Sequence, residues 1–163
     1  MPIEVRNQLE REAARGGVTL NAIANAALKK HTRFDGIMGP GHSVVLEKHV
    51  FSRLVEGIDV HLLKGIGRDF GEKTVKEIFG FSGFEFTVEN LIAHYFEPMG
   101  AYSGVYEVNR IRKGSLERLV LRHEYGMNWS VFLGEHLSGV FNSILAARPK
   151  IEVENNLVGI DLT

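Results

Sequence analysis

Residues 16–28 read GGVTLNAIANAAL, and they predict the turn around which the first part of the chain is organised. Gly16 and Gly17 can take a positive φ without steric cost, as the end of a helix requires. Thr19 then stands at an N-cap position, where its hydroxyl can accept a hydrogen bond from an amide two or three residues later. The following apolar residues have helical spacing: Leu20, Ile23, Ala24, Ala27 and Leu28.

A first helix is expected before this turn, because Val5, Leu9 and Ala13 recur at every fourth residue and Pro2 suits a first helical turn. Residues 2–34 are therefore predicted to form two short helices. Two helices of this size cannot bury enough apolar surface to fold alone. They need a partner chain or the rest of this chain, and the plainest interpretation is a helical hairpin packed on the downstream domain.

The sequence EREAA at residues 10–14, followed by GVTLNAI at residues 17–23, resembles the helix-turn-helix part of ribbon-helix-helix (Arc/MetJ/CopG-like) proteins. The resemblance covers about residues 1–34. It implies an intertwined homodimer whose second helix points its N-terminus at a DNA phosphate. The residues expected at the DNA backbone are Arg6, Arg15, Thr19, Leu20, Asn21 and Lys29.

One part of that family pattern is missing from the sequence. The family has a base-reading strand before its first helix, whereas only Met1 precedes Pro2 here. Phosphate contacts position a protein on DNA but do not specify a site. Either the start of the chain is trimmed or miscalled, or this protein has lost direct readout of the DNA sequence.

The charge distribution has the sign expected for a DNA-facing head on an acidic body. The 163 residues contain 19 Lys and Arg against 20 Asp and Glu. Six of the basic and three of the acidic residues lie within residues 1–34. The excess of basic residues in this segment favours binding of an anion such as DNA. A solvated helix face explains the excess almost as well.

The chain has no cysteine, which excludes disulfides, thiolate metal sites and a cysteine nucleophile. No apolar run reaches membrane-spanning length, and no signal-peptide pattern opens the chain. The expected location is therefore the cytoplasm, with no membrane partner.

A linker is predicted at residues 35–42, where three glycines and Pro40 gather. It would separate a helical pair, residues 1–34, from a second domain, residues 43–163. Helical spacing in the second domain predicts helices over 44–58 with Ser43 as its cap, 60–70, 72–79, and a helix from Thr87 to near Gly100.

The hydrophobic period then changes from 3.6 to 2. Alternation predicts strands at 102–108 and 119–125, joined by a turn at 112–115. A second hairpin with a turn at Asn155-Asn156 would pair Val153 with Val158 and Ile151 with Ile160.

Between the two hairpins, Asn128 is predicted to cap a long apolar helix that runs to Leu145. Gly134, Ser138 and Gly139 keep part of this helix thin, which permits the close approach of another backbone. The predicted fold is α+β: a helical pair, a helical segment, and a β-β-α-β-β antiparallel sheet with one long helix packed on it.

The stretch LRHEYGMNW at residues 121–129 loosely resembles a group of sensor and trafficking domains. The group comprises the vinyl-reductase-like sensor domain, the haem-dependent nitric-oxide-binding domain and the small subunits of the TRAPP tethering complex. The resemblance covers roughly residues 85–163. It implies a ligand-sensing or assembly domain, with a haem ligand at His94 as a minor alternative.

A candidate ligand pocket between the sheet and the long helix combines aromatic rings with polar tips. Its residues are His94, Tyr102, Tyr106, His123 and Trp129. The same residue types suit an ordinary core, because Trp and Tyr usually bury with one polar partner.

No metal, cofactor or catalytic residue is predicted. None of the seven histidines lies in an HExxH motif or at i, i+4 spacing, although an all-histidine site stays open. GIGRDFG at residues 65–71 mimics a dinucleotide-binding pattern, but helix-end and turn glycines explain it better. No nucleophile has a visible base, so an enzyme is not expected.

Two functions remain as hypotheses. The first is a dimeric DNA-binding transcriptional regulator whose C-terminal domain senses a small-molecule ligand or mediates assembly. The second is an assembly module without DNA affinity, in which the N-terminal helices pack between protomers.

Overall fold

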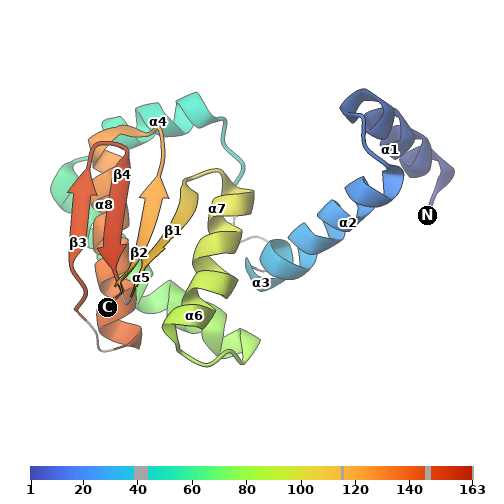
Figure 1. Cartoon of the computed structure of the whole chain (residues 1–163). Coiled ribbons are helices and arrows are strands. Elements are labelled where there is room, and N and C mark those ends of the chain that lie inside the picture. The colour runs from blue at the N-terminus through green and yellow to red at the C-terminus, as the bar shows by residue number, and fades with distance from the viewer. Residues whose placement is uncertain (39–43, 115, 146–147, 163) are drawn as a thin grey trace. The chain divides into compact units, whose positions relative to one another are not determined.

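The computed structural model describes residues 1–38, 44–114, 116–145 and 148–162. The chain divides into two compact units, Met1–His42 and Ser43–Thr163 (Figure 1). The described part of the first unit, residues 1–38, has four helical segments, namely α1 (Ile3–Gly16), α2 (Leu20–Lys30), the π-helical η1 (His31–Asp35) and α3 (Gly36–Met38).

The turn between α1 and α2 forms as its sequence predicts. Gly17 ends α1 with a φ of 63°, and its N–H donates to the carbonyl of Ala13. Thr19 caps α2, because its Oγ1 accepts a hydrogen bond of 3.1 Å from the N–H of Ala22. Both features are local, so the sequence determines them without reference to the rest of the fold.

The helical segment after α2 is longer than predicted. Helical backbone continues from Lys30 through η1 and α3 to Met38, so residues 35–38 of the predicted linker are helical. Gly36 keeps a helical φ of −69° at this point, since a glycine tolerates a helix at only a modest free-energy cost. Residues 39–42 of the linker lie outside the described residues.

The second unit is the predicted α+β domain. Its helical segments are α4 (Lys48–Glu56), α5 (Val60–Ser82), α6 (Val88–Leu91), the π-helical η2 (Ile92–Phe96), α7 (Glu97–Ser103) and α8 (Gly126–Ile144). Its strands are β1 (Glu107–Lys113), β2 (Leu116–Arg122), β3 (Ile151–Glu154) and β4 (Leu157–Asp161). The four strands form one antiparallel sheet in the order β1-β2-β4-β3.

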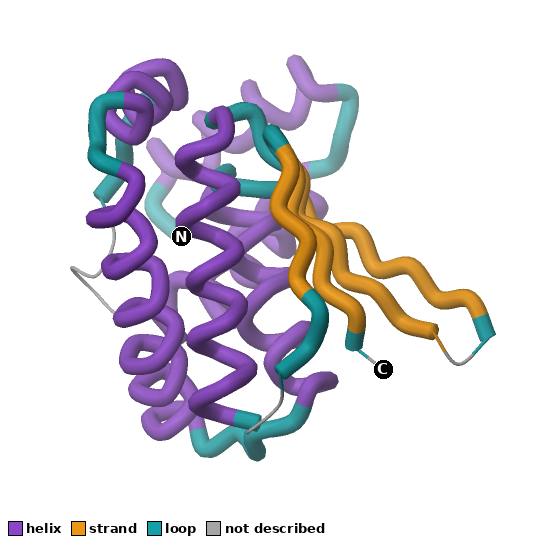
Figure 2. Tube along the Cα trace, turned by 90° about the vertical axis from the view of Figure 1, so that its left-hand side faces the viewer, coloured by secondary structure: helices purple, strands orange, loops and turns teal. Residues whose placement is uncertain are grey.

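Within this unit α8 packs against β3 and β4, and α5 packs along α8 (Figures 1 and 2). The inward side chains of the strands alternate with outward ones, so one face of the sheet is apolar. The centre of the core is formed by fully buried residues of α8 and of the sheet: Leu133, Leu137, Val140, Phe141, Leu119, Leu121, Val158 and Ile160.

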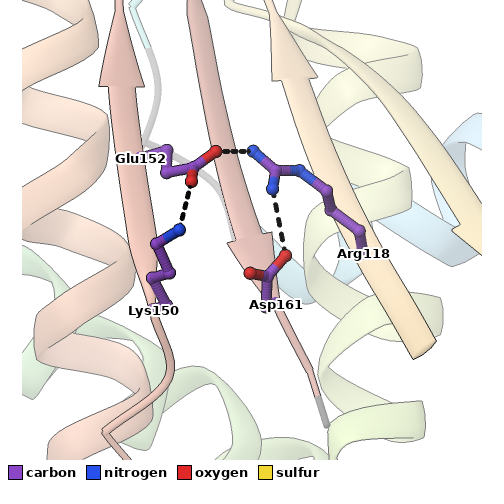
Figure 3. A network of polar contacts seen from close by, with 4 residues as sticks. All are labelled: Arg118, Lys150, Glu152 and Asp161. Carbon is purple, nitrogen blue, oxygen red and sulfur yellow. Dashed lines mark hydrogen bonds and ion pairs between the residues drawn. The ribbon is translucent and has the colours of Figure 1, made fainter. Parts of the chain in front are cut away.

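The other face of the sheet carries a network of ion pairs (Figure 3). Arg118 of β2 reaches across β4 and donates to Asp161 at 3.1 Å and to Glu152 of β3. Glu152 also accepts from Lys150 at 2.6 Å. The Arg118 guanidinium occupies the space above Gly159 that a Cβ atom would need. Hydrogen bonds from Lys150 and Arg118 lower the pKa of Glu152 to about 2.

The second hairpin has the predicted register. Val153 pairs with Val158 and Ile151 pairs with Ile160. Asn156 in the turn has a φ of 63°, a left-handed conformation that asparagine tolerates better than most residues.

Other predicted boundaries are wrong by several residues. The helix predicted from 44 begins at Lys48, where Glu47 rather than Ser43 accepts from the first turn, and Ser43 lies outside the described residues. The helix predicted to end near Gly100 continues to Ser103. The first hairpin is therefore shifted: β1 begins at Glu107, and β2 begins at Leu116.

The predicted break between helices 60–70 and 72–79 is also wrong, because α5 is continuous from Val60 to Ser82. Two of its glycines, Gly67 and Gly71, are packing residues rather than turn residues. A Cβ at Gly67 would lie 2.5 Å from the carbonyl oxygen of Phe132, and one at Gly71 would collide with the carbonyl of His136. On the facing helix, a Cβ at Gly139 would lie 2.7 Å from the carbonyl oxygen of Arg68. Of the predicted thin section of α8, Gly139 thus meets α5, whereas a Cβ at Gly134 would lie 2.6 Å from Cγ2 of Val153 in β3.

Asn128 has a different role from the predicted N-cap. Helix α8 begins two residues earlier, at Gly126, and Asn128 lies inside it. Its side-chain amide donates to the carbonyls of Val55 at 3.1 Å and Ile58 at 3.2 Å. It therefore ties α8 to the C-terminal end of α4 and to the turn that follows it, where the carbonyl of Val55 also accepts from the N–H of Ile58 at 3.3 Å.

Candidate functional site

Four of the six predicted DNA-backbone residues lie at the turn between α1 and α2, and the other two lie farther along the helices. Thr19, Leu20 and Asn21 form the start of α2, where the first N–H groups have no intrahelical acceptor. Arg15 stands in the last turn of α1, on the other side of the same short turn. Arg6 and Lys29 are each about nine residues from this point along a helix, roughly 14 Å at the rise of an α-helix. One copy of the unit thus brings Arg15, but not the other two cations, to the start of α2.

One of these cations, Arg6, and the neighbouring Lys30, which was not predicted, already have carboxylate partners. Arg6 donates to Glu10 at 2.8 Å, and Lys30 lies 3.2 Å from Asp35. Both pairs are exposed, so water and salt screen them strongly. Each cation can therefore exchange its carboxylate partner for a phosphate at little cost in free energy.

The predicted pocket residues do not all share one cavity. Tyr106 and His123 line a cavity of about 510 Å³ in the second unit. His94 instead stacks on Phe84, with ring centroids 3.9 Å apart. Tyr102 lies in α7. Trp129 belongs to the core side of α8, and its Nε1 donates to the carbonyl of Val105 at 3.0 Å.

The cavity lies where several chain segments end. The start of β1 and the end of β2 lie there beside the turn between β3 and β4. The C-terminal end of α7 and the start of α4 complete the lining. The lining residues that sequence reasoning missed are mostly charged or polar: Lys48, Glu107, Arg122, Glu124, Asn155 and Asn156. Glu107 and Arg122 face each other in the register of β1 and β2. Charged residues at neighbouring strand ends could have indicated this site. The predicted strands 102–108 and 119–125 instead placed both residues inside strands.

His123 forms part of the buried wall and is held by two hydrogen bonds. The N–H of Tyr125 donates to its Nδ1 at 3.1 Å, and its Nε2 lies 2.9 Å from the hydroxyl of Ser130. Since Nδ1 is an acceptor, the proton of the neutral ring is on Nε2 and is donated to Ser130. A general base needs Nε2 free of a proton. This serine–histidine pair is therefore structural, and burial lowers the pKa of His123 to about 4.

A second buried histidine pairs with a tyrosine in the core. Tyr95 in η2 and Nε2 of His136 in α8 lie 3.1 Å apart. Burial lowers the pKa of His136 to about 3 and raises the pKa of Tyr95. Both side chains are neutral near pH 7. Among residues 1–38, 44–114, 116–145 and 148–162, no group of three His, Asp or Glu side chains is arranged to hold a metal ion.

Comparison of the sequence with models of protein families, with curated proteins and with solved structures finds no match. Within the described parts of the chain, no helix has both the length and the apolar character needed to cross a membrane.

Proposed function

We propose that this protein is a homodimeric DNA-binding transcriptional regulator. In this proposal the first unit self-associates and holds the DNA backbone, and the second unit senses a ligand or mediates assembly. The observation that carries the proposal is the capped and exposed start of α2 in a helical unit with almost no core of its own.

The thin core of the first unit supports self-association. Among its described residues only Ala13 and Phe34 are buried apolar residues. Val5 is 46% exposed and Leu28 is 62% exposed, although both belong to the predicted apolar stripes. A second copy of the unit would cover such a face, in line with the resemblance to ribbon-helix-helix proteins.

The start of α2 supports binding to phosphate. Its free N–H groups and the positive end of the helix dipole attract an anion. Arg15 adds a positive charge four residues before the Thr19 cap. A symmetric dimer would present two such helix starts, and the cations along α1 and α2 would extend each contact.

The test is binding of the full chain to a labelled duplex of random sequence, measured by fluorescence anisotropy as the KCl concentration is raised. We expect binding at low salt that weakens steeply, because each neutralised phosphate releases a counterion. The double variant Arg15→Gln/Lys29→Gln should bind more weakly, with a salt slope smaller by roughly 2 per protomer.

A charge-matched control is Lys64→Gln/Lys76→Gln, which removes two exposed cations from α5 of the second unit. It should leave both the affinity and the salt slope unchanged. Equal weakening by the two double variants would show that only net charge matters, and would refute a contact at α2. If the full chain does not bind at low salt but is a dimer, the assembly module without DNA affinity replaces the regulator.

A further inference from the structure

The cavity of the second unit combines a buried wall with a charged rim. Tyr106 and His123 are buried, whereas Lys48, Arg122, Glu107 and Glu124 are exposed around it. Its volume of about 510 Å³ is within the usual range for small-molecule sites. The cavity is built entirely from one unit, so its geometry does not depend on where the first unit lies.

Arg122 differs from the other arginines of the sheet. Arg110 and Arg112 of β1 both contact Glu117, and Arg118 of β2 contacts Glu152 and Asp161. Within the described chain, Arg122 has no carboxylate within ion-pair distance, although Glu107 faces it across the strands.

Lys48 likewise lacks a carboxylate partner among the residues that the structure describes. Its aliphatic stem passes close to Gly104, where a Cβ would lie 3.9 Å from Cε, and this places the side chain at the wall of the cavity. Two cations from different elements thus border the same space, and neither forms an ion pair with a described residue.

Tyr106 also lines the cavity and is only 5% exposed. It contributes an aromatic ring to the buried wall, next to His123. The wall is therefore largely apolar, and the charges that could recognise a ligand lie at the rim.

The carboxylates decide which kind of anion fits. Glu107 and Glu124 also lack ion-pair partners among the described residues, so they balance Lys48 and Arg122. A ligand with only negative charge would be attracted by two groups and repelled by two. A ligand with a carboxylate and an ammonium group can satisfy both pairs.

We propose that this cavity binds a small zwitterion of the amino-acid type. The ligand carboxylate would bind Arg122 and Lys48, and the ligand ammonium would bind Glu107 or Glu124. The inference rests on the sensor part of the proposed function and is independent of DNA binding.

The test is saturation-transfer NMR of the full chain, without DNA, against each of the twenty standard amino acids. We expect at least one to bind, with its N-acetyl and carboxamide derivatives bound at least tenfold more weakly. If none binds at 10 mM, the proposal is overturned. Binding of the N-acetyl derivative as tight as that of the free amino acid would also overturn it, because the site would then recognise a simple anion.

Variants localise the binding. Arg122→Gln should weaken it at least tenfold, and so should at least one of Glu107→Gln and Glu124→Gln, because each removes a partner of a ligand charge. Arg148→Gln is the matched control, since Arg148 is another exposed arginine of this unit and does not line the cavity. Equal loss in Arg122→Gln and Arg148→Gln would place the ligand elsewhere. DNA binding of the same preparations, measured separately, keeps a failure here distinct from a failure of the proposed regulator.

Discussion

His123 and His136 are the buried titratable side chains that a change of pH affects first. Burial lowers their pKa values from 6.5 to about 4 and about 3. In the unfolded chain both imidazoles have ordinary pKa values, so unfolding takes up protons between about pH 6.5 and 4. Acidification therefore destabilises the native state over this window.

We expect the free energy of unfolding of the second unit to fall by roughly 2 kcal/mol per buried histidine between pH 7 and pH 5. Urea unfolding at the two pH values measures this. The double variant Tyr95→Phe/His136→Phe replaces both partners of the buried pair by apolar groups and should lose about half of the fall. His61→Gln, at an exposed histidine, should keep all of it. A pH dependence that is the same in all three proteins would contradict the assignment.

Asn128 connects two helices through a single amide. Its amide donates to the carbonyls of Val55, in the last turn of α4, and of Ile58, just after it. Asn128→Ala should lower the free energy of unfolding by about 1–2 kcal/mol, because partly buried hydrogen bonds between α8 and this segment are lost. Asn142→Ala is the control, since Asn142 bonds only to Ser138 of its own helix, and it should stay within about 0.5 kcal/mol of the parent.

At the scale of elements, the contact between α5 and α8 depends on glycines. A side chain at Gly71 would collide with the backbone of α8 at His136, whereas a Cβ at Gly65 of the same helix meets nothing within 4 Å. Because glycines lie at this crossing, no side chain stands between the two helices, and their backbones are in direct contact.

Gly71→Ala should therefore destabilise the second unit by about 2–3 kcal/mol through overpacking. Gly65→Ala should stabilise it by about 0.5–1 kcal/mol, because alanine is the better helix former and the position is open. If α5 packs as described, thermal and urea unfolding show changes of opposite sign in the free energy of unfolding for the two variants. Two stabilising substitutions would show that the helices are farther apart.

The sheet combines an apolar face with a face that is held by charges. Glu152 accepts hydrogen bonds from Lys150 and Arg118, and its lowered pKa keeps the carboxylate ionised well below its ordinary value of 4.5. This network contributes stability above pH 4.5 and loses it only as the pH falls towards 2. The acid response between pH 7 and 5 thus belongs to the histidines and not to the sheet network.

At the scale of the whole molecule, self-association is the property that the proposed regulator requires. Leu28→Asp places a charge on the exposed apolar stripe of α2. We expect it to convert a dimer to a monomer in light scattering coupled to size-exclusion chromatography, with the helical circular-dichroism signal of the second unit retained. Val45→Asp is the control, at a side chain that is 97% exposed in the second unit. A Leu28→Asp protein that stays dimeric would remove the first unit from the interface.

The sequence by itself determined the features that follow from local rules. The turn at Gly17, the cap at Thr19 and the register of Val153 with Val158 depend on φ preferences, on one side-chain hydrogen bond and on the period of a strand. The α+β class and the order of strands around one long helix followed from the change of hydrophobic period. The turn, the cap and the hairpin register are each decided by residues within about ten positions of each other.

Only the tertiary structure decided where distant residues meet. Gly67 and Gly71 have the sequence signature of turns, but the backbone of α8 makes them interior packing positions in one long helix. Asn128 has the signature of an N-cap, but α4 supplies its acceptors. The cavity joins Lys48, Arg122 and Asn155, which are more than thirty residues apart in each pairing. Local propensity has no information about such contacts, because their free energy exists only once the chain has closed the loops between them.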